Sequence, residues 1–118
     1  MQNKVYDIRK RSYLFGLAVI KFLEALPRDY ISDALGRQLL RSSTSVGANI
    51  VEAQGSRSKR DFANFCTHAL KSANESRFWL ELLKDSKGKN LQNIDYLIEE
   101  VKELANILAS SIISLRSD

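Results

Sequence analysis

The residue types that most often carry chemistry are scarce in this sequence of 118 residues. It holds one cysteine, Cys66, and one histidine, His68. Two positions so close on a helix do not face each other, so no Cys–His nucleophilic pair is expected. Cys66 is interpreted as a small buried side chain. The counts also exclude a disulfide framework and a metal cluster of several cysteines or histidines. We predict no enzyme activity, no cofactor and no metal.

Carboxylates do not change this interpretation. Glu99, Glu100 and Glu103 form a local acidic cluster, which we interpret as the solvated face of an amphipathic helix. The Glu-x-x-His pattern of di-iron bundles does not occur. Gly55 stands alone, without the glycine-rich run of a phosphate loop.

One polar set has helical spacing. Ser45, Asn49 and Glu52 recur at steps of four and three, and Ser72 and Glu75 are three apart. Antiparallel packing of two helices would bring the two groups together. Such a set is either a hydrogen-bonded network that fixes the register of the helices or a small polar pocket. We favour the structural network, because no general base or metal ligand joins it.

Basic residues are unevenly distributed. The net charge is +4, from 18 Lys and Arg against 14 Asp and Glu. Between residues 37 and 60 the sequence has one acid, Glu52, and five bases, which are our candidate nucleic-acid contacts: Arg37, Arg41, Arg57, Lys59 and Arg60. Three of them cluster beside a predicted helix start, where backbone N–H groups and arginine side chains suit phosphate oxygens. The alternative is a solvated basic end of the protein.

Four helical segments account for nearly the whole chain. The first spans about residues 7–26, with Asp7 as N-cap and Pro27 as terminator. The second spans 32–54, capped by Ser32 and closed by Gly55, although residues 42–47 are poor helix formers. The third opens with the capping box at Ser58 and ends near 85. The fourth follows Asn90 as N-cap and carries an unbroken heptad stripe from 91 to 115.

Short joints make consecutive helices antiparallel neighbours, and no segment alternates like a strand. The sequence predicts an all-α fold, an antiparallel up-down-up-down four-helix bundle, as a single domain over 1–118. Two segments are more apolar than one bundle seam requires. Residues 13–20 are apolar or glycine on nearly all sides, and the fourth segment has a second apolar line at Leu97, Leu104 and Ile107. This surplus indicates either association with other copies or simply a very apolar helix in a small protein.

The longest uncharged run near the N-terminus, residues 12–20, is too short to span a bilayer. Charged residues follow it directly and a cleavage site of small residues is missing, so we do not interpret it as a signal peptide. We therefore expect a cytoplasmic protein without a membrane partner.

Residues 45–53, Ser-Val-Gly-Ala-Asn-Ile-Val-Glu-Ala, resemble the hallmark of a bacterial four-helix-bundle family. Its members include proteins encoded within intervening sequences of 23S ribosomal RNA genes, and the accessory variability proteins of diversity-generating retroelements are similar. Weaker matches follow at residues 58–62, at Phe65, at 69–70 and at 72–75. Family members often carry Glu-Gly where this chain has Glu52-Ala53, and Gly where it has Lys71, so the branch is not fixed by these motifs.

The resemblance implies a homopentameric barrel of bundles without known catalytic activity. For the retroelement branch it implies a basic surface that binds nucleic acid and a reverse transcriptase partner. We therefore expect a non-enzymatic, oligomeric bundle that binds RNA or DNA through phosphate contacts, without base readout. The alternative is a protein-interaction scaffold of the intervening-sequence type that binds no nucleic acid.

Overall fold

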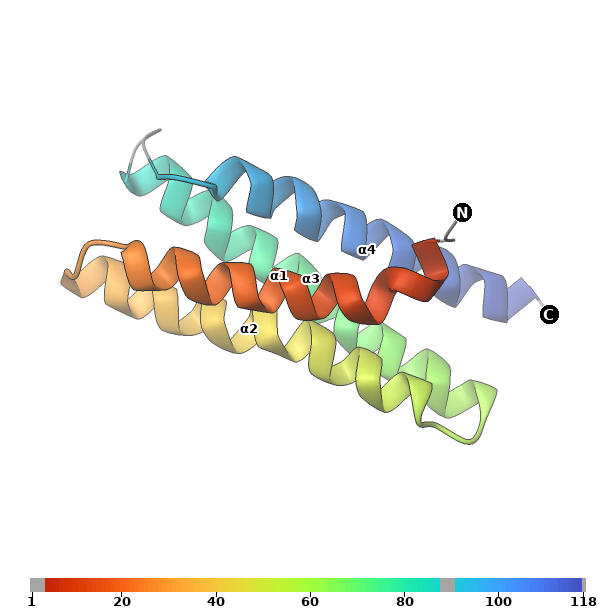
Figure 1. The fold of residues 1–118 in the computed structure, drawn as a ribbon. Coiled ribbons are helices and arrows are strands. Elements are labelled where there is room, and N and C mark those ends of the chain that lie inside the picture. The colour runs from red at the N-terminus through yellow and green to blue at the C-terminus, as the bar shows by residue number, and fades with distance from the viewer. Residues whose placement is uncertain (1–3, 88–90, 118) are drawn as a thin grey trace.

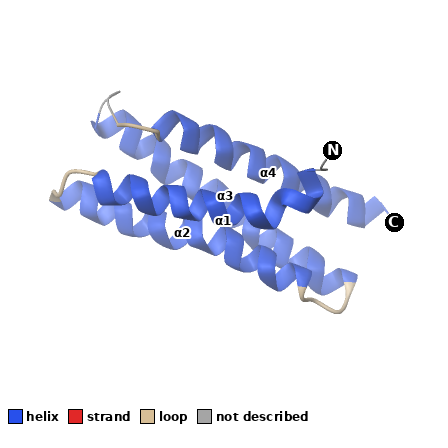
Figure 2. Ribbon diagram, viewed as in Figure 1, coloured by secondary structure: helices blue, strands red, loops and turns tan. Residues whose placement is uncertain are grey.

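The computed structural model describes residues 4–87 and 91–117, and these form four helices (Figures 1 and 2). Helix α1 spans Lys4–Ala25, α2 Tyr30–Gln54, α3 Lys59–Lys87 and α4 Ile94–Ser117. The backbones of α1 and α2, of α2 and α3, of α3 and α4, and of α4 and α1 approach closely, whereas among the described residues the diagonal pairs have no such close backbone approach. The predicted all-α, up-down-up-down four-helix bundle is therefore confirmed.

The first two helices begin earlier than the sequence suggested. Helix α1 starts at Lys4, so Asp7 lies inside it and is not its N-cap. Helix α2 is capped by Asp29 rather than Ser32, because Asp29 has extended backbone angles and its carboxylate accepts the backbone N–H of Ser32 at 2.8 Å. The Ser32 hydroxyl donates a second hydrogen bond to the same carboxylate at 3.0 Å. The aspartate is the stronger cap here because one carboxylate receives both donors.

The other helix ends agree more closely with the sequence. Gly55 closes α2 through backbone hydrogen bonds to Val51 and Glu52. Ser58 caps α3, its hydroxyl accepting the N–H of Asp61 at 3.0 Å. The predicted cap Asn90 lies outside the described residues, and α4 begins only at Ile94. Asn93, just before it, has a φ of 72°, a left-handed conformation that asparagine tolerates better than most residues.

The core accounts for the surplus of apolar residues expected on α4 but not for the surplus expected on α1. On α4, Leu97 and Leu104 are completely buried, because this helix packs against both α1 and α3 and uses two apolar lines to do so. The second apolar line of the fourth helix is thus buried in the monomer at Leu97 and Leu104 and partly buried at Ile107. On α1 the excess remains, with four large side chains exposed by 36% to 68%: Tyr13, Leu14, Leu17 and Ile20.

The poor helix formers at residues 42–47 are helical because their small side chains allow close contacts on two sides. Ser42 and Ser43 are completely buried, and their hydroxyls donate to carbonyls three residues earlier. Toward α1, a Cβ added to Gly47 would stand 3.4 Å from the hydroxyl of Ser12. Toward α3, the hydroxyl of Ser76 lies 2.8 Å from that of Ser42. Tertiary packing therefore overrides weak local propensity.

A bidentate ion pair ties α1 to α4. The Arg11 guanidinium donates to both carboxylate oxygens of Glu100, at 3.0 and 2.8 Å. Both side chains are largely buried, and this hydrogen bonding raises the pKa of Arg11 above its usual value. Glu100 was predicted to lie on a solvated acidic face, and this prediction is wrong because its side chain is largely buried between α1 and α4. The pair fixes the register of the two helices at the side of the bundle where they meet.

The Asp29 cap makes stability depend on pH in a defined window. The hydrogen bond from the Ser32 N–H, helped by Lys87, lowers the pKa of Asp29 to about 2. Because the folded pKa lies below the unfolded value of about 3.9, this contribution is complete above about pH 4 and is lost as pH falls toward 2. Thermal unfolding followed by circular dichroism should show Asp29→Ala less stable than wild type at pH 7, with the difference shrinking as pH falls to 2. Asp29→Asn, which keeps a capping oxygen, is the control; a pH-independent difference would contradict this account.

The hydroxyl pair of Ser42 and Ser76 should behave as a coupled unit. Ser76 can also donate to the Ser72 carbonyl at 2.8 Å, so it keeps a partner when Ser42 is replaced. We expect Ser42→Ala and Ser76→Ala each to cost about 1 kcal/mol in urea unfolding. The double variant should cost less than the sum, because each single variant already removes the hydrogen bond between the two hydroxyls and the double variant removes it only once. Strictly additive losses would show that the two hydroxyls do not interact.

Candidate nucleic-acid interface

Three of the five basic candidates lie together at the turn between α2 and α3. Arg57 is in the turn, and Lys59 and Arg60 are in the first helical turn of α3. All three are exposed, and none forms an ion pair within the part of the chain that the structure describes. The nearest carboxylate in sequence is Asp61, also exposed. We call Arg57, Lys59 and Arg60 the basic turn.

The other two candidates are not part of this cluster. Arg41 precedes the end of α2 by 13 residues, about 20 Å along the helix. Its guanidinium is paired with Glu75 of α3 and also donates to Gln38 at 3.1 Å. Arg37 lies farther still from the basic turn, is exposed, and lines a groove near the joint between α1 and α2. The five positions therefore do not form one surface.

Part of the polar set meets at the seam between α2 and α3. The amide of Asn49 donates to the hydroxyl of Ser45 at 3.0 Å, and the hydroxyl of Ser72 lies 3.1 Å from the same oxygen. These three side chains are half-buried. Their hydrogen bonds join two helices, which is the geometry of a register-fixing network.

The two glutamates of the set are placed differently. Glu75 lies on the same seam but bonds to Arg41 and to the indole N–H of Trp79, which donates at 3.2 Å. Glu52 is exposed and forms no ion pair among the described residues. The structure thus joins Ser45, Asn49 and Ser72, places Glu75 in a neighbouring cluster and leaves Glu52 outside both.

Sequence reasoning missed three members of this seam. Ser42 and Ser76 form the buried hydroxyl pair, and Trp79 holds Glu75. Ser42 and Ser76 each lie one helical turn from a residue already in the set, so extending the pattern by three or four residues would have found them.

The residues with nucleophilic or metal-binding chemistry are not assembled into a site. Cys66 is buried, and burial raises the pKa of its thiol, whereas His68 is exposed. Residues 4–87 and 91–117 hold no group of three or more His, Cys, Asp or Glu that could bind a metal ion. Within the same residues no helix is long and apolar enough to cross a membrane.

Comparison with known proteins places the chain in a family. Residues 4–110 match the family model of the 23S rRNA-intervening sequence protein. The fold is similar to the crystal structure of a protein with unknown function from the S23 ribosomal protein family of Bacteroides thetaiotaomicron VPI-5482. That match has a TM-score of 0.78 and 33% identity over 89% of this chain and 97% of the other. No curated protein gives a significant match. With 107 of 118 residues matched, the chain belongs to the 23S rRNA-intervening sequence protein family.

Proposed function

We propose that this protein is a non-enzymatic, self-associating bundle that binds the phosphate backbone of RNA or DNA through the basic turn. The observation that carries the proposal is the exposure of Arg57, Lys59 and Arg60 at one turn without ion-pair partners among the described residues. Guanidinium and ammonium groups that are already neutralised contribute little to phosphate binding, and these three are not neutralised.

The local backbone adds to the attraction. Lys59 and Arg60 stand in the first turn of α3, where the helix dipole is positive and the first N–H groups lack helical partners. The Ser58 hydroxyl satisfies one of these groups, the N–H of Asp61. Phosphate oxygens would meet the basic side chains together with the remaining N–H groups. Residues 55–61 contain no aromatic side chain on which a base could stack, so binding should be independent of base sequence.

The exposed apolar residues of α1 favour self-association, which would strengthen phosphate binding. The exposed side chains of α1 give copies an apolar surface to share. Several copies would present several basic turns, which multiplies a weak phosphate contact. Five copies, and a reverse transcriptase as protein partner, are the finer expectations that come from the family resemblance alone.

A protein-interaction scaffold is the competing function. It is favoured by the pairing of Arg41 with Glu75, which removes one of the five predicted basic contacts. In that case the basic turn contacts a protein partner, and charge reversal there would weaken capture of that partner in a protein that binds no nucleic acid.

Charge removal at the basic turn should separate these functions. We expect the triple variant Arg57→Gln, Lys59→Gln, Arg60→Gln to bind single-stranded RNA and duplex DNA more weakly in mobility-shift titrations. The slope of log affinity against log salt should decrease in magnitude by roughly 2 to 3, because about three phosphate contacts are lost.

The matched control removes three charges at the opposite end of the bundle, with Arg28→Gln, Lys84→Gln and Lys87→Gln. Each of these cations is already paired with an aspartate: Asp33, Asp95 and Asp29 respectively. The control should bind like wild type. No binding by the wild-type protein at low salt, or equal loss in the control, would refute the proposed nucleic-acid interface.

A further inference from the structure

One corner of the bundle is open at the end that holds the basic turn. Arg11 of α1 pairs with Glu100 of α4, so the antiparallel register sets Lys4, the first residue of α1, level with Ile107. Helix α4 continues from there to Ser117, a further stretch of about 15 Å. In Figure 1, α4 extends past the start of α1 at the end of the bundle where the α2–α3 turn lies. Helix α1 therefore does not run alongside the last turns of α4.

A groove lies in this corner, between the first turn of α3 and the C-terminal half of α4. Its volume is about 610 Å³. Phe62 of α3 and Ile107 and Leu115 of α4 form its apolar walls, and all three are half-buried. The rest of the described lining is polar and comes from α4: Glu103, Asn106, Ser110, Ser111 and Ser114. Apolar walls with hydroxyl and amide groups around them suit a ligand that is flat and apolar on its faces and polar at its edges.

Phe62 connects the groove to the basic turn. Its N–H donates to the Ser58 carbonyl at 3.0 Å, which places it in the first turn of α3. Lys59 is three residues before Phe62, so the two side chains leave the same side of the helix. Because α3 and α4 are antiparallel, Lys59 lies toward the C-terminal end of α4, where Ser110 lines the groove. The carboxylate of Glu103 is about 10 Å farther from that end. An anionic chain held at Lys59 therefore meets the serine end of the groove first.

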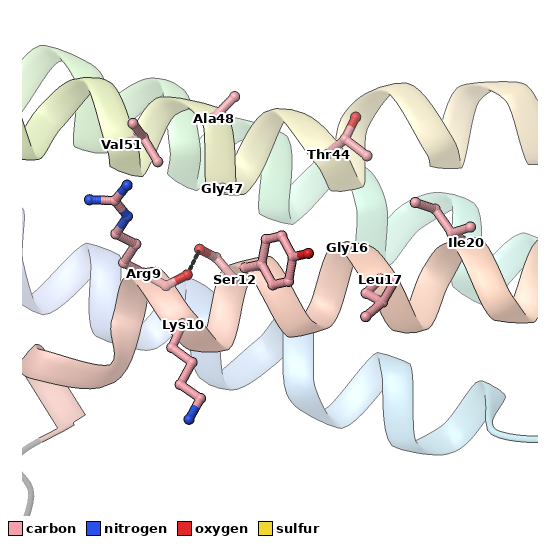
Figure 3. A pocket seen from close by; sticks show the side chains of 11 residues that line it. Arg9, Lys10, Ser12, Gly16, Leu17, Ile20, Thr44, Gly47, Ala48 and Val51 are labelled. Atoms are coloured by element: carbon pink, nitrogen blue, oxygen red, sulfur yellow. Dashed lines mark hydrogen bonds between the residues drawn. The ribbon is translucent and has the colours of Figure 1, made fainter.

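A second groove, between α1 and α2, has a similar volume of about 640 Å³ but a different lining (Figure 3). Leu17 and Ile20 line it, and both belong to the exposed apolar surface of α1 that copies would share. Its described lining comes from α1 and α2 alone, whereas the groove beside Phe62 is continuous with the first turn of α3. The α3–α4 groove is therefore the one that a strand on the basic turn would enter.

We infer that this groove takes an unpaired base of a nucleic-acid strand whose phosphates lie on the basic turn. The inference rests on the proposed function and names its substrate class, single-stranded RNA or DNA rather than duplex. The faces of the base contact Phe62 and Ile107, and the hydroxyls of Ser110 and Ser114 meet the sugar or the edge of the base. Every base has an apolar face, so binding stays independent of base sequence.

A duplex fits the same site less well. Its phosphates can reach the basic turn, but its bases are paired and stacked, and taking one out of the stack costs free energy. A single strand makes both contacts without that cost. The groove therefore converts a phosphate contact that does not distinguish the two forms into a preference for unpaired strands.

Mobility-shift titrations at one low salt concentration test the preference with probes of equal length: single-stranded RNA, single-stranded DNA, duplex DNA and a single DNA strand that carries abasic sites throughout. Wild type should bind the single strands about tenfold more tightly than the duplex and the abasic strand, because a base contact is added to the phosphate contacts. A preference in both single-stranded arms supports the inference for either nucleic acid, and one in the RNA arm alone supports it for RNA.

Filling the groove should remove the preference and nothing else. Ser110→Leu combined with Ser114→Leu enlarges two exposed side chains of the lining without changing charge. This variant should bind the single strands as weakly as the abasic strand, with duplex affinity unchanged. Phe62→Leu, which keeps an apolar side chain but removes the ring, should lose affinity for the single strands in the same way. The control, Asn74→Leu combined with Ser86→Leu, enlarges exposed polar positions of α3 outside the groove and should keep the wild-type preference.

The outcomes separate this inference from the proposed function. Equal affinity of wild type for the single strands, the duplex and the abasic strand would overturn the base site while leaving the basic turn as a phosphate interface. A filled groove with an undiminished preference would also overturn it. The basic-turn variant should weaken the binding of every probe, whereas absence of all binding by wild type would refute both.

Discussion

Close approach of α2 to both of its neighbours is the constraint on which the bundle depends. Residues 42–47 are serine, threonine, valine and glycine, and they let α1 and α3 come near on two sides. Larger side chains at these positions would push α1 and α3 away from α2, and the small buried hydroxyls of Ser42 and Ser43 would be lost from the seams. The hydroxyls of Ser42 and Ser43 donate to nearby carbonyls, and Ser42 also accepts from Ser76. Small polar residues therefore fill the seam without leaving a buried polar side-chain atom unpaired among the described residues.

The same choice of residues shapes the outer surface. Small side chains on α2 that permit tight packing inside also leave its outer wall low at Thr44 and Ala48. On α1, by contrast, the large side chains of Tyr13 and Leu17 are exposed on the surface of the monomer. A substitution that enlarged residues 44–48 would therefore alter both the α1–α2 seam and the exposed outer surface of α2.

The fold could be predicted from the sequence because apolar residues recur along it with helical periodicity. Four apolar patterns separated by short joints are compatible with one simple topology. The heptad stripe of α4 identified most of its core, because Ile94, Ile98, Val101, Leu108 and Ile112 are buried. The first residues of the helices were harder to predict from the sequence. Asp29 and Ser32 are both good caps, and the geometry of one carboxylate accepting two donors decides between them. Similarly, the burial of Leu97 and Leu104 depends on α4 having two neighbours, which a single helical pattern does not reveal.

The candidate sites were harder to predict because charge counts ignore distance and pairing. Arg41 counts as a cation in the sequence, yet the structure pairs it with Glu75. Arg37 and Arg57 fall within one basic stretch, yet most of the length of α2 lies between them. The basic turn remains a coherent group because its residues are adjacent in sequence, which keeps them adjacent in any fold. Local clusters are thus predictable from sequence alone, whereas a surface that spans a long helix has to be established from its actual neighbours.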